Sequence, residues 1–446
     1  MSAEDAVVAV RRALGGRRLV WFGIRGEDGE ALLQLPELEA SYALTAPLRS
    51  GRLAPESNVT LEEIAGARPD LDRFDVDSPP DEHLREFRRR LLREVSGRCV
   101  LMTYRPSALV SALAFSMADT MTLAGLFKDR QLAFEHKPWV ESSLAARGVR
   151  GLGWCYVADE HRARVKRLLA EGPLVLRASR SSGGVGVVPV HTAEQVDGNW
   201  PEQSDAFVAA APLLEPVVPV NFSGCVFADG GVRLHPPSIQ LIGIPSCTDR
   251  PFGYCGNDFG GVGALGERVL GELDAMGRSI AAWLHEERYR GCFGVDALVH
   301  EGRAHFAEIN ARFQGSSAMS AAVADALGEP DLFVDHLAAM LGLPAAGRGR
   351  SLPEWAREQP ALTQVVLHNR AGGPLERDRR RPLPAGVRLA QVPGDLSIDA
   401  GATLCRLELA RSVTQTGFEL DAETSALVGE LQDVFVPAGA GVPLPG

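Results

Sequence analysis

The segment from Gly291 to Ser317, which reads GCFGVDALVHEGRAHFAEINARFQGSS, constrains the fold more than any other part of the chain. An apolar-rich run containing Asp296 precedes a turn near residues 301 and 302, and a second run, AHFAEIN, alternates apolar and polar residues. Two such runs around a turn predict a β-hairpin. Glu308 and Asn310 are two residues apart, so they project from one face of their strand, where Asp296 can meet them from the partner strand.

The predicted hairpin groups residue types that suit a magnesium–phosphate site. Mg2+ takes one or two carboxylates and completes its shell with water and substrate phosphate oxygens, so Asp296, Glu308 and Asn310 are candidate ligands. Arg312, two residues further on, adds a planar cationic group for phosphate. Each residue taken singly could be a polar residue on a solvated hairpin. Their joint spacing favours the metal site.

A second signal lies upstream in PLVLRASRSSGGVGVVPV, residues 173–190, where two apolar strands flank a loop with small side chains. The backbone N–H groups of such a loop can bind phosphate oxygens. The loop is neither a Walker nor a Rossmann loop, because each of those opens a helix and VVPV continues as strand. The candidate nucleotide-binding residues here are Arg177, Ser181, Ser182, Gly183, Gly184 and Gly186.

The order of these pieces resembles the ATP-grasp superfamily of carboxylate–amine ligases over roughly residues 128–341. The resemblance places Lys137, in HKPWVESSLAARGV, on the ATP phosphates and makes loop 179–186 the glycine-rich lid. It places Arg177 near the phosphates, at a position that is ordinarily lysine, and gives Arg177 and Arg312 catalytic roles. Arg312 would stabilise the phosphate or acyl phosphate.

The same resemblance implies where the nucleotide base and the metal bind. APLLEPVVPVNFSGCVF is similar to the interdomain strand that holds adenine, so Glu215 and the backbone beside it would contact the base. GVDAL and EINARFQGS are similar to the closing metal motif, which implies two Mg2+ ions on Asp296, Glu308 and Asn310. No acidic residue near Asn221 matches the usual ribose contact, so ribose recognition stays unassigned.

The fold class expected is α/β and α+β, an ATP-grasp fold with added terminal regions. Strand and helix signals alternate over residues 1–126, which predicts an open α/β pre-ATP-grasp domain. The ATP-grasp nucleotide-binding and catalytic domain would span residues 127–343. A small β-rich closing region would follow over 344–436, and a disordered tail over 437–446.

Composition limits the kinds of partner. The chain has 446 residues, 45% of them hydrophobic and 23% charged, which is ordinary for a globular protein of two or three domains. A formal charge of −11 argues against a nucleic-acid surface. The absence of a long apolar run or a signal-peptide core argues against a membrane segment and predicts a cytoplasmic location. Seven cysteines, an odd number at no metal-ligand spacing, are expected to be reduced.

The predicted function is an ATP- and Mg2+-dependent ligase that activates a carboxylate as an acyl phosphate and joins it to an amine. The resemblance is strongest to stand-alone amino-acid and peptide ligases of natural-product biosynthesis. Both substrates would be small molecules, and a homodimer is the default state. A ligase that loads an amino acid onto a carrier-protein thiol is one alternative, and an inactive nucleotide sensor or scaffold is another. A biotin-carboxylase type is disfavoured, because its carrier and transferase partners are absent.

Three further positions carry weaker expectations. Asn257 and Asp258, in YCGNDFGG, could bind the amino group of the acceptor. Arg411 could anchor a substrate carboxylate, although an ordinary surface arginine is the simpler interpretation. The acids of segment 69–83 are expected to be solvated rather than catalytic.

Overall fold

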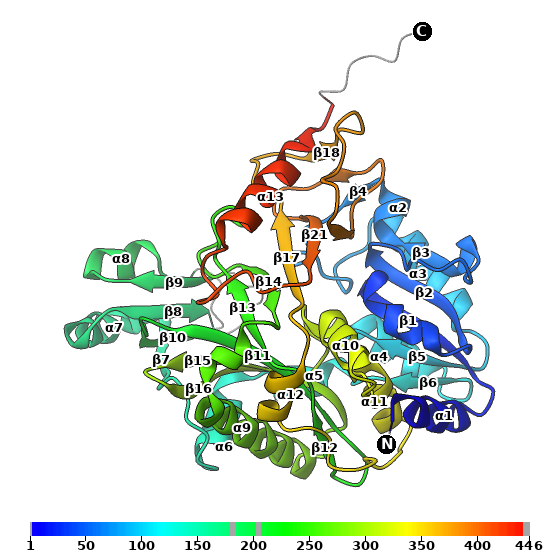
Figure 1. Cartoon of the computed structure of the whole chain (residues 1–446), viewed down its shortest axis with the longest axis horizontal. Helices are drawn as coiled ribbons and strands as arrows, with labels where there is room; N and C mark the ends of the chain where they lie inside the picture. The colour runs from blue at the N-terminus through cyan, green and yellow to red at the C-terminus, as the bar shows by residue number, and fades with distance from the viewer. Residues whose placement is uncertain (1, 179–183, 185, 202–206, 440–446) are drawn as a thin grey trace.

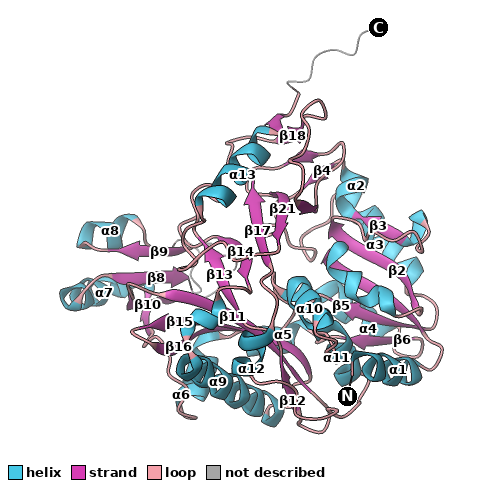
Figure 2. Ribbon diagram, in the orientation of Figure 1, coloured by secondary structure: helices cyan, strands magenta, loops and turns pink. Residues whose placement is uncertain are grey.

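The computed structural model describes residues 2–178, 184, 186–201 and 207–439. The chain forms an amino-terminal α/β layer, a small antiparallel sheet that projects to one side, and a large central sheet (Figure 1). Helices cover the outer faces of these sheets (Figure 2). Of the helices described, none combines the length and apolar character needed to cross a bilayer.

The amino-terminal layer is a parallel sheet of five strands in the order β3-β2-β1-β5-β6. Its core consists of strand residues such as Val20, Leu101 and Val100 packed between helices on both faces. The open α/β layer predicted from alternating strand and helix signals is therefore present. Its elements are α1 (Ala3–Leu14), β1 (Arg18–Arg25), η1 (Glu27–Gln34), β2 (Leu38–Thr45), η2 (Pro55–Ser57), β3 (Asn58–Thr60), α2 (Leu61–Ala65), α3 (Glu82–Glu94), β5 (Cys99–Thr103), α4 (Ala108–Ser116) and β6 (Met121–Ala124).

The small sheet is antiparallel, with the order β7-β10-β8-β9. Strands β8 and β9 pair directly, so the predicted hairpin around the glycine-rich loop is present; residues 179–183 and 185 of that loop lie outside the described residues. The elements of this region are α5 (Lys128–Phe134), α6 (Lys137–Ala145), β7 (Cys155–Ala158), η3 (Asp159–His161), α7 (Arg162–Leu168), η4 (Leu169–Glu171), β8 (Leu174–Ala178), β9 (Val187–Val190), α8 (Ala193–Gly198) and β10 (Phe207–Pro212).

The central sheet has nine strands in the order β16-β15-β11-β13-β14-β17-β21-β19, with β12 paired to β11. Helix α9 packs on the β11 and β16 end through buried residues such as Leu273 and Ile280 (Figure 2). The elements are β11 (Val218–Val226), β12 (Val232–Leu234), β13 (Ser238–Ile242), β14 (Tyr254–Asp258), η5 (Val262–Leu265), α9 (Glu267–Glu286), β15 (Gly291–His300), β16 (Arg303–Asn310), α10 (Ser317–Ala326), α11 (Leu332–Met340), α12 (Leu352–Glu358), β17 (Thr363–His368), β19 (Arg388–Ala390) and β21 (Thr403–Leu409).

The carboxyl-terminal strands β17, β21 and β19, from the region predicted to close the site, continue the central sheet. Strand β14 pairs with β17 in the register Gly256↔Val365, and β17 pairs with β21. Gly256 makes this junction possible: its φ is +122°, and a Cβ there would lie 1.8 Å from the carbonyl oxygen of Gln364. Helix α13 (Ala422–Asp433) covers the end of the sheet. Of the tail predicted over 437–446, residues 440–446 lie outside the described residues.

A second small sheet ties the amino-terminal region to the carboxyl-terminal one. Its order is β22-β18-β20-β4, formed by β22 (Phe435–Pro437), β18 (Leu375–Arg377), β20 (Ser397–Ile398) and β4 (Ala67–Arg68). Arg68 is buried, and its guanidinium binds both carboxylate oxygens of Glu62, at 2.6 and 3.1 Å. It also donates to the carbonyl oxygens of Gln391 and Thr403, at 2.7 and 3.1 Å. One side chain therefore joins parts of the chain more than 300 residues apart.

We predict that Arg68→Ala destabilises the protein strongly. The substitution leaves the Glu62 carboxylate buried without its cation, which typically costs about 3–5 kcal/mol. Thermal unfolding should show a clearly lower midpoint for this variant. The matched control is Arg73→Ala, because the Arg73 side chain is 77% exposed and its ion pair with Asp70 is long, at 3.6 Å; its midpoint should stay near that of the wild type. Equal midpoints for both variants would contradict the role given to Arg68.

Candidate active site

A cavity of about 390 Å³ lies where the central sheet, the small antiparallel sheet and the amino-terminal layer meet. Its walls come from three sources: strands β11, β13, β14, β15 and β16; the β8–β9 hairpin with the chain before β11; and the carboxyl ends of β1 and β5. Many of the predicted site residues line it, namely Arg177, Gly184, Asp296, Glu308, Asn310 and Arg312, together with Asn257. Lys137 forms an ion pair with Glu308, which lines the cavity.

The predicted hairpin is formed by β15 and β16. In their antiparallel register Asp296 lies opposite Glu308, and Gly294 lies opposite Asn310, with a bulge immediately after Asp296. The Asn310 side chain donates from Nδ2 to Oδ2 of Asp296 at 3.0 Å. The two carboxylates and the amide thus converge on one face, as the alternation of the sequence requires.

Asp296 is surrounded by side-chain amides from three other elements. Its Oδ1 accepts hydrogen bonds from Asn221 at 2.7 Å, Gln240 at 2.8 Å and Gln314 at 3.3 Å. Burial raises the pKa of Asp296 to about 6, and the nearby Glu308 carboxylate adds to this rise, while the amide hydrogen bonds oppose it. No role was predicted for these amides from the sequence, although Gln314 lies in the same segment, 291–317, as Asp296.

The pKa of Glu308 is shifted in the opposite direction from that of Asp296. Burial opposes its ionisation, but the Lys137 ammonium, whose Nζ lies 2.9 Å from Oε2, outweighs burial and holds the pKa of Glu308 below its ordinary value. Lys137 is the first residue of α6, and only 8% of its side chain is exposed. The predicted nucleotide lysine therefore lies at the metal hairpin, paired with one of the predicted metal ligands.

Arg312 lies at the end of the hairpin between several acceptors. Its Nη2 donates to Oδ1 of Asn310 at 2.8 Å, its Nη1 donates to the carbonyl oxygen of Phe313 at 3.1 Å, and its Nε lies 3.4 Å from the Glu135 carboxylate. Desolvation lowers the pKa of Arg312, but Glu135 and the hairpin carboxylates raise it overall, so the group is a fixed cation.

Arg177 lines the cavity with its charge already paired, which the sequence did not predict. Its Nη2 donates to the Glu141 carboxylate and, at 3.1 Å, to the Tyr156 hydroxyl. The guanidinium lies over the Trp154 ring, 3.7 Å from the ring centroid, and its Nε has no hydrogen-bond partner among the described residues. In this arrangement Arg177 forms part of the cavity wall.

The glycine-rich loop contributes one described position to the cavity. Ser181, Ser182 and Gly183 lie outside the described residues. Gly184 lines the cavity with φ +76°, and a Cβ there would lie 2.1 Å from the carbonyl oxygen of Phe252. Gly186, with φ +72°, directly precedes β9. Gly184 therefore lies against the segment that joins β13 to β14.

Glu215 does not line the cavity, so the predicted contact of its side chain with a base is not supported. The residue is exposed in a bend, because β10 and β11 are separate strands joined by residues 213–217 rather than one continuous strand. Its neighbours Leu213, Leu214 and Val217 line the cavity instead. With Trp154, Val175 and Leu298 they make this end of the cavity apolar.

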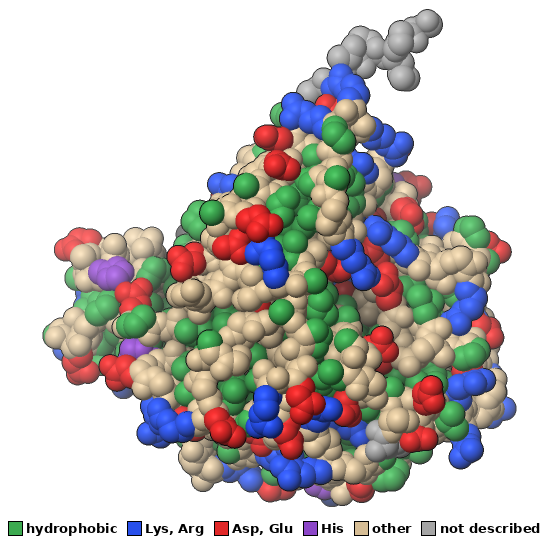
Figure 3. All heavy atoms as spheres, in the orientation of Figure 1, with side chains coloured by type: hydrophobic (Ala, Val, Ile, Leu, Met, Phe, Trp, Pro, Cys, Tyr) green, Lys and Arg blue, Asp and Glu red, His purple; other side chains and the backbone are tan. Residues whose placement is uncertain are grey.

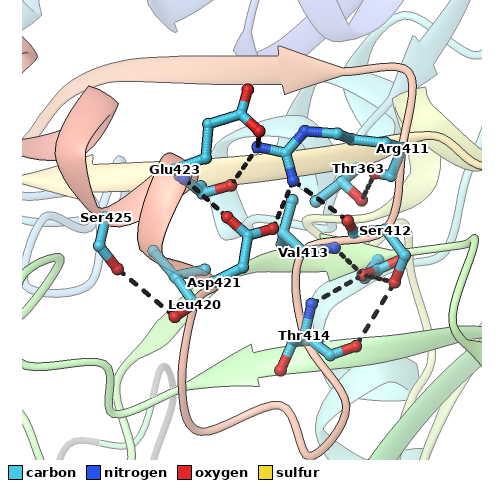
Figure 4. A network of polar contacts seen from close by, with 11 residues as sticks. Thr363, Arg411, Ser412, Val413, Thr414, Leu420, Asp421, Glu423 and Ser425 are labelled. Carbon is cyan, nitrogen blue, oxygen red and sulfur yellow. Dashed lines mark hydrogen bonds and ion pairs between the residues drawn. The ribbon is translucent and has the colours of Figure 1, made fainter.

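Asp258 is a structural residue, which corrects its predicted contact with the acceptor. The carboxylate is buried and accepts from Ser412 Oγ at 2.6 Å and from the backbone N–H groups of Val413 and Thr414 at 2.7 and 3.3 Å (Figure 4). Arg411 points away from these bonds and pairs with Asp421 and Glu423 (Figure 4). These contacts fix the segment that brings Phe418 to the cavity.

Two acidic side chains of segment 69–83 form ion pairs, so they are not simply solvated. Asp70 and Asp72 both contact the guanidinium of Arg250, the Asp70 oxygen at 2.7 Å. Asp72 also lines the cavity edge. This ion-pair cluster connects the amino-terminal layer to the segment between β13 and β14.

The residues present fit a magnesium ion. In the part of the chain that the structure describes, no cluster holds three or more His, Cys, Asp or Glu side chains in a metal-binding arrangement. The hairpin offers two carboxylates and one amide, a donor set typical of Mg2+ sites that leave the remaining positions to water and phosphate oxygens. On the face drawn in Figure 3, basic and acidic side chains are interspersed without a broad basic area.

We predict that Mg2+ binding weakens below pH 6. Because Asp296 has a pKa of about 6, it gains a proton as the pH falls through that value and loses the charge that attracts the cation. Calorimetric titration of Mg2+ into protein with ADP should give a falling affinity between pH 7.5 and pH 5. In the Asp296→Asn variant, affinity should be low at every pH. An affinity for the wild type that is constant across this range would contradict the assignment.

The comparisons with known proteins agree with this architecture. No family model matches the chain. A formate-dependent phosphoribosylglycinamide formyltransferase of Geobacter metallireducens is 26% identical over 220 residues, which are 48% of this chain and 49% of the relative. The chain thus aligns with about half the length of this curated relative.

Solved structures resemble the chain over nearly its whole length. A Campylobacter jejuni biotin carboxylase has a TM-score of 0.59 at 14% identity, covering 96% of this chain and 89% of that one. A Staphylococcus aureus N5-carboxyaminoimidazole synthetase complexed with ADP has a TM-score of 0.54 at 10% identity, covering 93% and 97%. An Aspergillus clavatus N5-carboxyaminoimidazole synthase complexed with ADP and 5-aminoimidazole ribonucleotide has 0.56 at 13%, covering 94% and 99%. The expected ATP-grasp fold is confirmed.

Proposed function

We propose that the protein is an ATP- and Mg2+-dependent ligase that converts a carboxylate into an acyl phosphate and joins it to an amine, forming ADP and phosphate. The observation that carries this proposal is the convergence of Asp296, Glu308, Asn310 and Arg312 on one face of the β15–β16 hairpin, beside Lys137 and a cavity. These groups match what transfer of a γ-phosphoryl group needs, which is positioning and neutralisation of charge.

The apolar end of the cavity suits the nucleotide base. Trp154, Leu213, Leu214 and Leu298 line it, and apolar and aromatic walls with a few polar groups are typical of cofactor sites. Two of the similar structures contain ADP. We assign the base to this end, with the backbone of residues 213–217 as its polar contact, so that the phosphates point towards the hairpin.

The hairpin end then carries the chemistry. Mg2+ held by Asp296, Glu308 and Asn310, as two ions when the site is full, would neutralise the phosphate oxygens. Lys137 and Arg312 supply the remaining positive charge, and Arg312 is fixed in place by Glu135 and Asn310. The amides around Asp296 hold its carboxylate in one orientation.

The proposed reaction balances in two steps. A carboxylate oxygen of the substrate bonds to the γ-phosphorus while the bond from that phosphorus to the bridging oxygen breaks, which releases ADP. The amine nitrogen then attacks the acyl carbon, phosphate leaves with the electron pair of the C–O bond, and the amine loses a proton. Neither step needs a Ser, Cys or His nucleophile. The carboxylate in this proposal is that of an amino acid or peptide, and natural-product biosynthesis is the proposed setting.

A coupled assay of ADP release tests the proposal. Protein, ATP and Mg2+ are combined with pairs of amino acids and amines, and product masses are read directly. ADP release that depends on both substrates, with a product heavier than either, supports the ligase. Product found only on a carrier-protein thiol would indicate the loading reaction instead. ATP-dependent thermal stabilisation without ADP release from any pair would indicate a nucleotide sensor.

We predict that Glu308→Gln reduces turnover by about 100-fold or more while the fold stays intact. The change removes one negative charge from the metal site and leaves Lys137 without its carboxylate partner. The matched control is Glu301→Gln, since the Glu301 side chain lies at the hairpin turn and is 82% exposed. Turnover of the control should equal that of the wild type. Full activity of the Glu308 variant would rule out the metal assignment.

We predict that Lys137→Ala raises the apparent KM for ATP by about tenfold, and more than it raises the KM for the acceptor. The ammonium lies at the hairpin that faces the phosphates in the proposed complex. Steady-state kinetics with each substrate varied in turn separate the two effects. A larger change for the acceptor would place Lys137 outside the nucleotide site.

A further inference from the structure

The amino-terminal layer forms the wall of the cavity at the end away from the apolar base pocket. Residues from the carboxyl ends of β1 and β5 reach it, namely Ile24, Arg25, Tyr104 and Arg105, with Leu71 and Asp72 from the segment that follows β4. The charges on this wall bear on which substrates the cavity accepts, and the inference below rests on the proposed function.

Most charged groups on this wall have a partner within the protein. Arg25 pairs with Asp28 at 2.7 Å and donates to the Tyr104 hydroxyl at 3.1 Å. Asp72 pairs with Arg250. These pairs leave little net charge for a substrate.

Arg105 is the exception. Among the described residues it forms no ion pair, and its one polar contact is a hydrogen bond from Nη2 to the carbonyl oxygen of Phe74 at 3.3 Å. Burial lowers the pKa of Arg105, the neighbouring Arg312 cation lowers it further, and Asp75, Tyr104 and Glu135 oppose these effects only in part. A half-buried cation beside a second cation is unfavourable unless an anion joins them.

The ATP phosphates are not the natural partner of Arg105. In the proposed complex they lie against the β15–β16 hairpin, where Lys137 and the metal ligands meet them. The carboxylate that becomes the acyl phosphate must touch the γ-phosphate on that same side. The amine attacks one face of the planar acyl group, and we place the remainder of the acceptor against the wall formed by the ends of β1 and β5.

We propose that Arg105 binds an anionic group, a carboxylate or a phosphate monoester, carried by the acceptor amine. The acceptor is then an amine with its own negative charge, such as an amino acid or a phosphorylated amine, rather than a simple amine. The anion would lie between Arg105 and Arg312 and offset their repulsion, and the guanidinium of Arg105 has free N–H groups for it. Leu71, Phe252 and Phe418 are apolar residues that also line the cavity.

Three amines of similar length distinguish the possible anions: β-alanine carries a carboxylate, O-phosphoethanolamine carries a phosphate, and ethanolamine is neutral. Each is titrated calorimetrically into the full chain with Mg2+ and ADP, which needs no turnover. At least one anionic amine should bind about tenfold or more tightly than ethanolamine. The anionic amine that binds more tightly shows whether the site recognises a carboxylate or a phosphate. Equal binding of all three, or no binding of either anionic amine, overturns the proposal.

Variants test whether Arg105 causes the preference for anionic over neutral amines. Arg105→Gln should abolish the difference between anionic and neutral amines, and Arg105→Lys should restore part of it, while Arg73→Gln should leave it unchanged. Retention of the preference in Arg105→Gln overturns the assignment. In the ADP-release assay, Arg105→Gln should raise KM for the anionic acceptor more than it lowers kcat. Absence of ADP release with every acceptor would count against the ligase, whereas the binding titrations would still decide the role of Arg105.

Discussion

The antiparallel pairing that sets Asp296 opposite Glu308 is the constraint on which the site depends. Two carboxylates directly across a ladder repel each other, and burial makes the repulsion stronger. The structure offsets this in two different ways. Side-chain amides surround Asp296, and an ammonium binds Glu308. Neighbouring elements supply these groups: β11 supplies Asn221, β13 supplies Gln240, and α6 supplies Lys137.

This division gives the two carboxylates different electrostatic behaviour although they belong to one hairpin. The pKa of Asp296 rises with burial to about 6, while the Lys137 contact keeps that of Glu308 low. Glu308 is therefore the permanent anion, and Asp296 becomes fully charged only when a cation or a higher pH favours it. A binding site with one fixed and one adjustable negative charge suits a metal that arrives together with a nucleotide.

The sequence predicted the hairpin well, because a period of two residues determines which side chains share a face of a strand. It did not predict that Gln240 and Gln314 surround Asp296, because these side chains meet only through tertiary packing. The surroundings of Glu215 and Asp258 were not predicted for a similar reason. Their roles depend on a bend and on a distant loop, neither of which leaves a periodic signal. The continuation of the central sheet through β17 is a long-range pairing of the same kind.

Among the described strands, the two sheets that enclose the cavity share no ladder of hydrogen bonds: β7 to β10 pair among themselves, and β11 pairs with central strands. Residues 213–217 and the chain before β7 are the covalent links between them. An isolated β-bridge joins Gly151, in the chain before β7, to Phe306 of β16. A displacement of the small sheet relative to the central sheet would break this bridge and contacts such as that of Arg177 with Glu141, but no ladder between described strands.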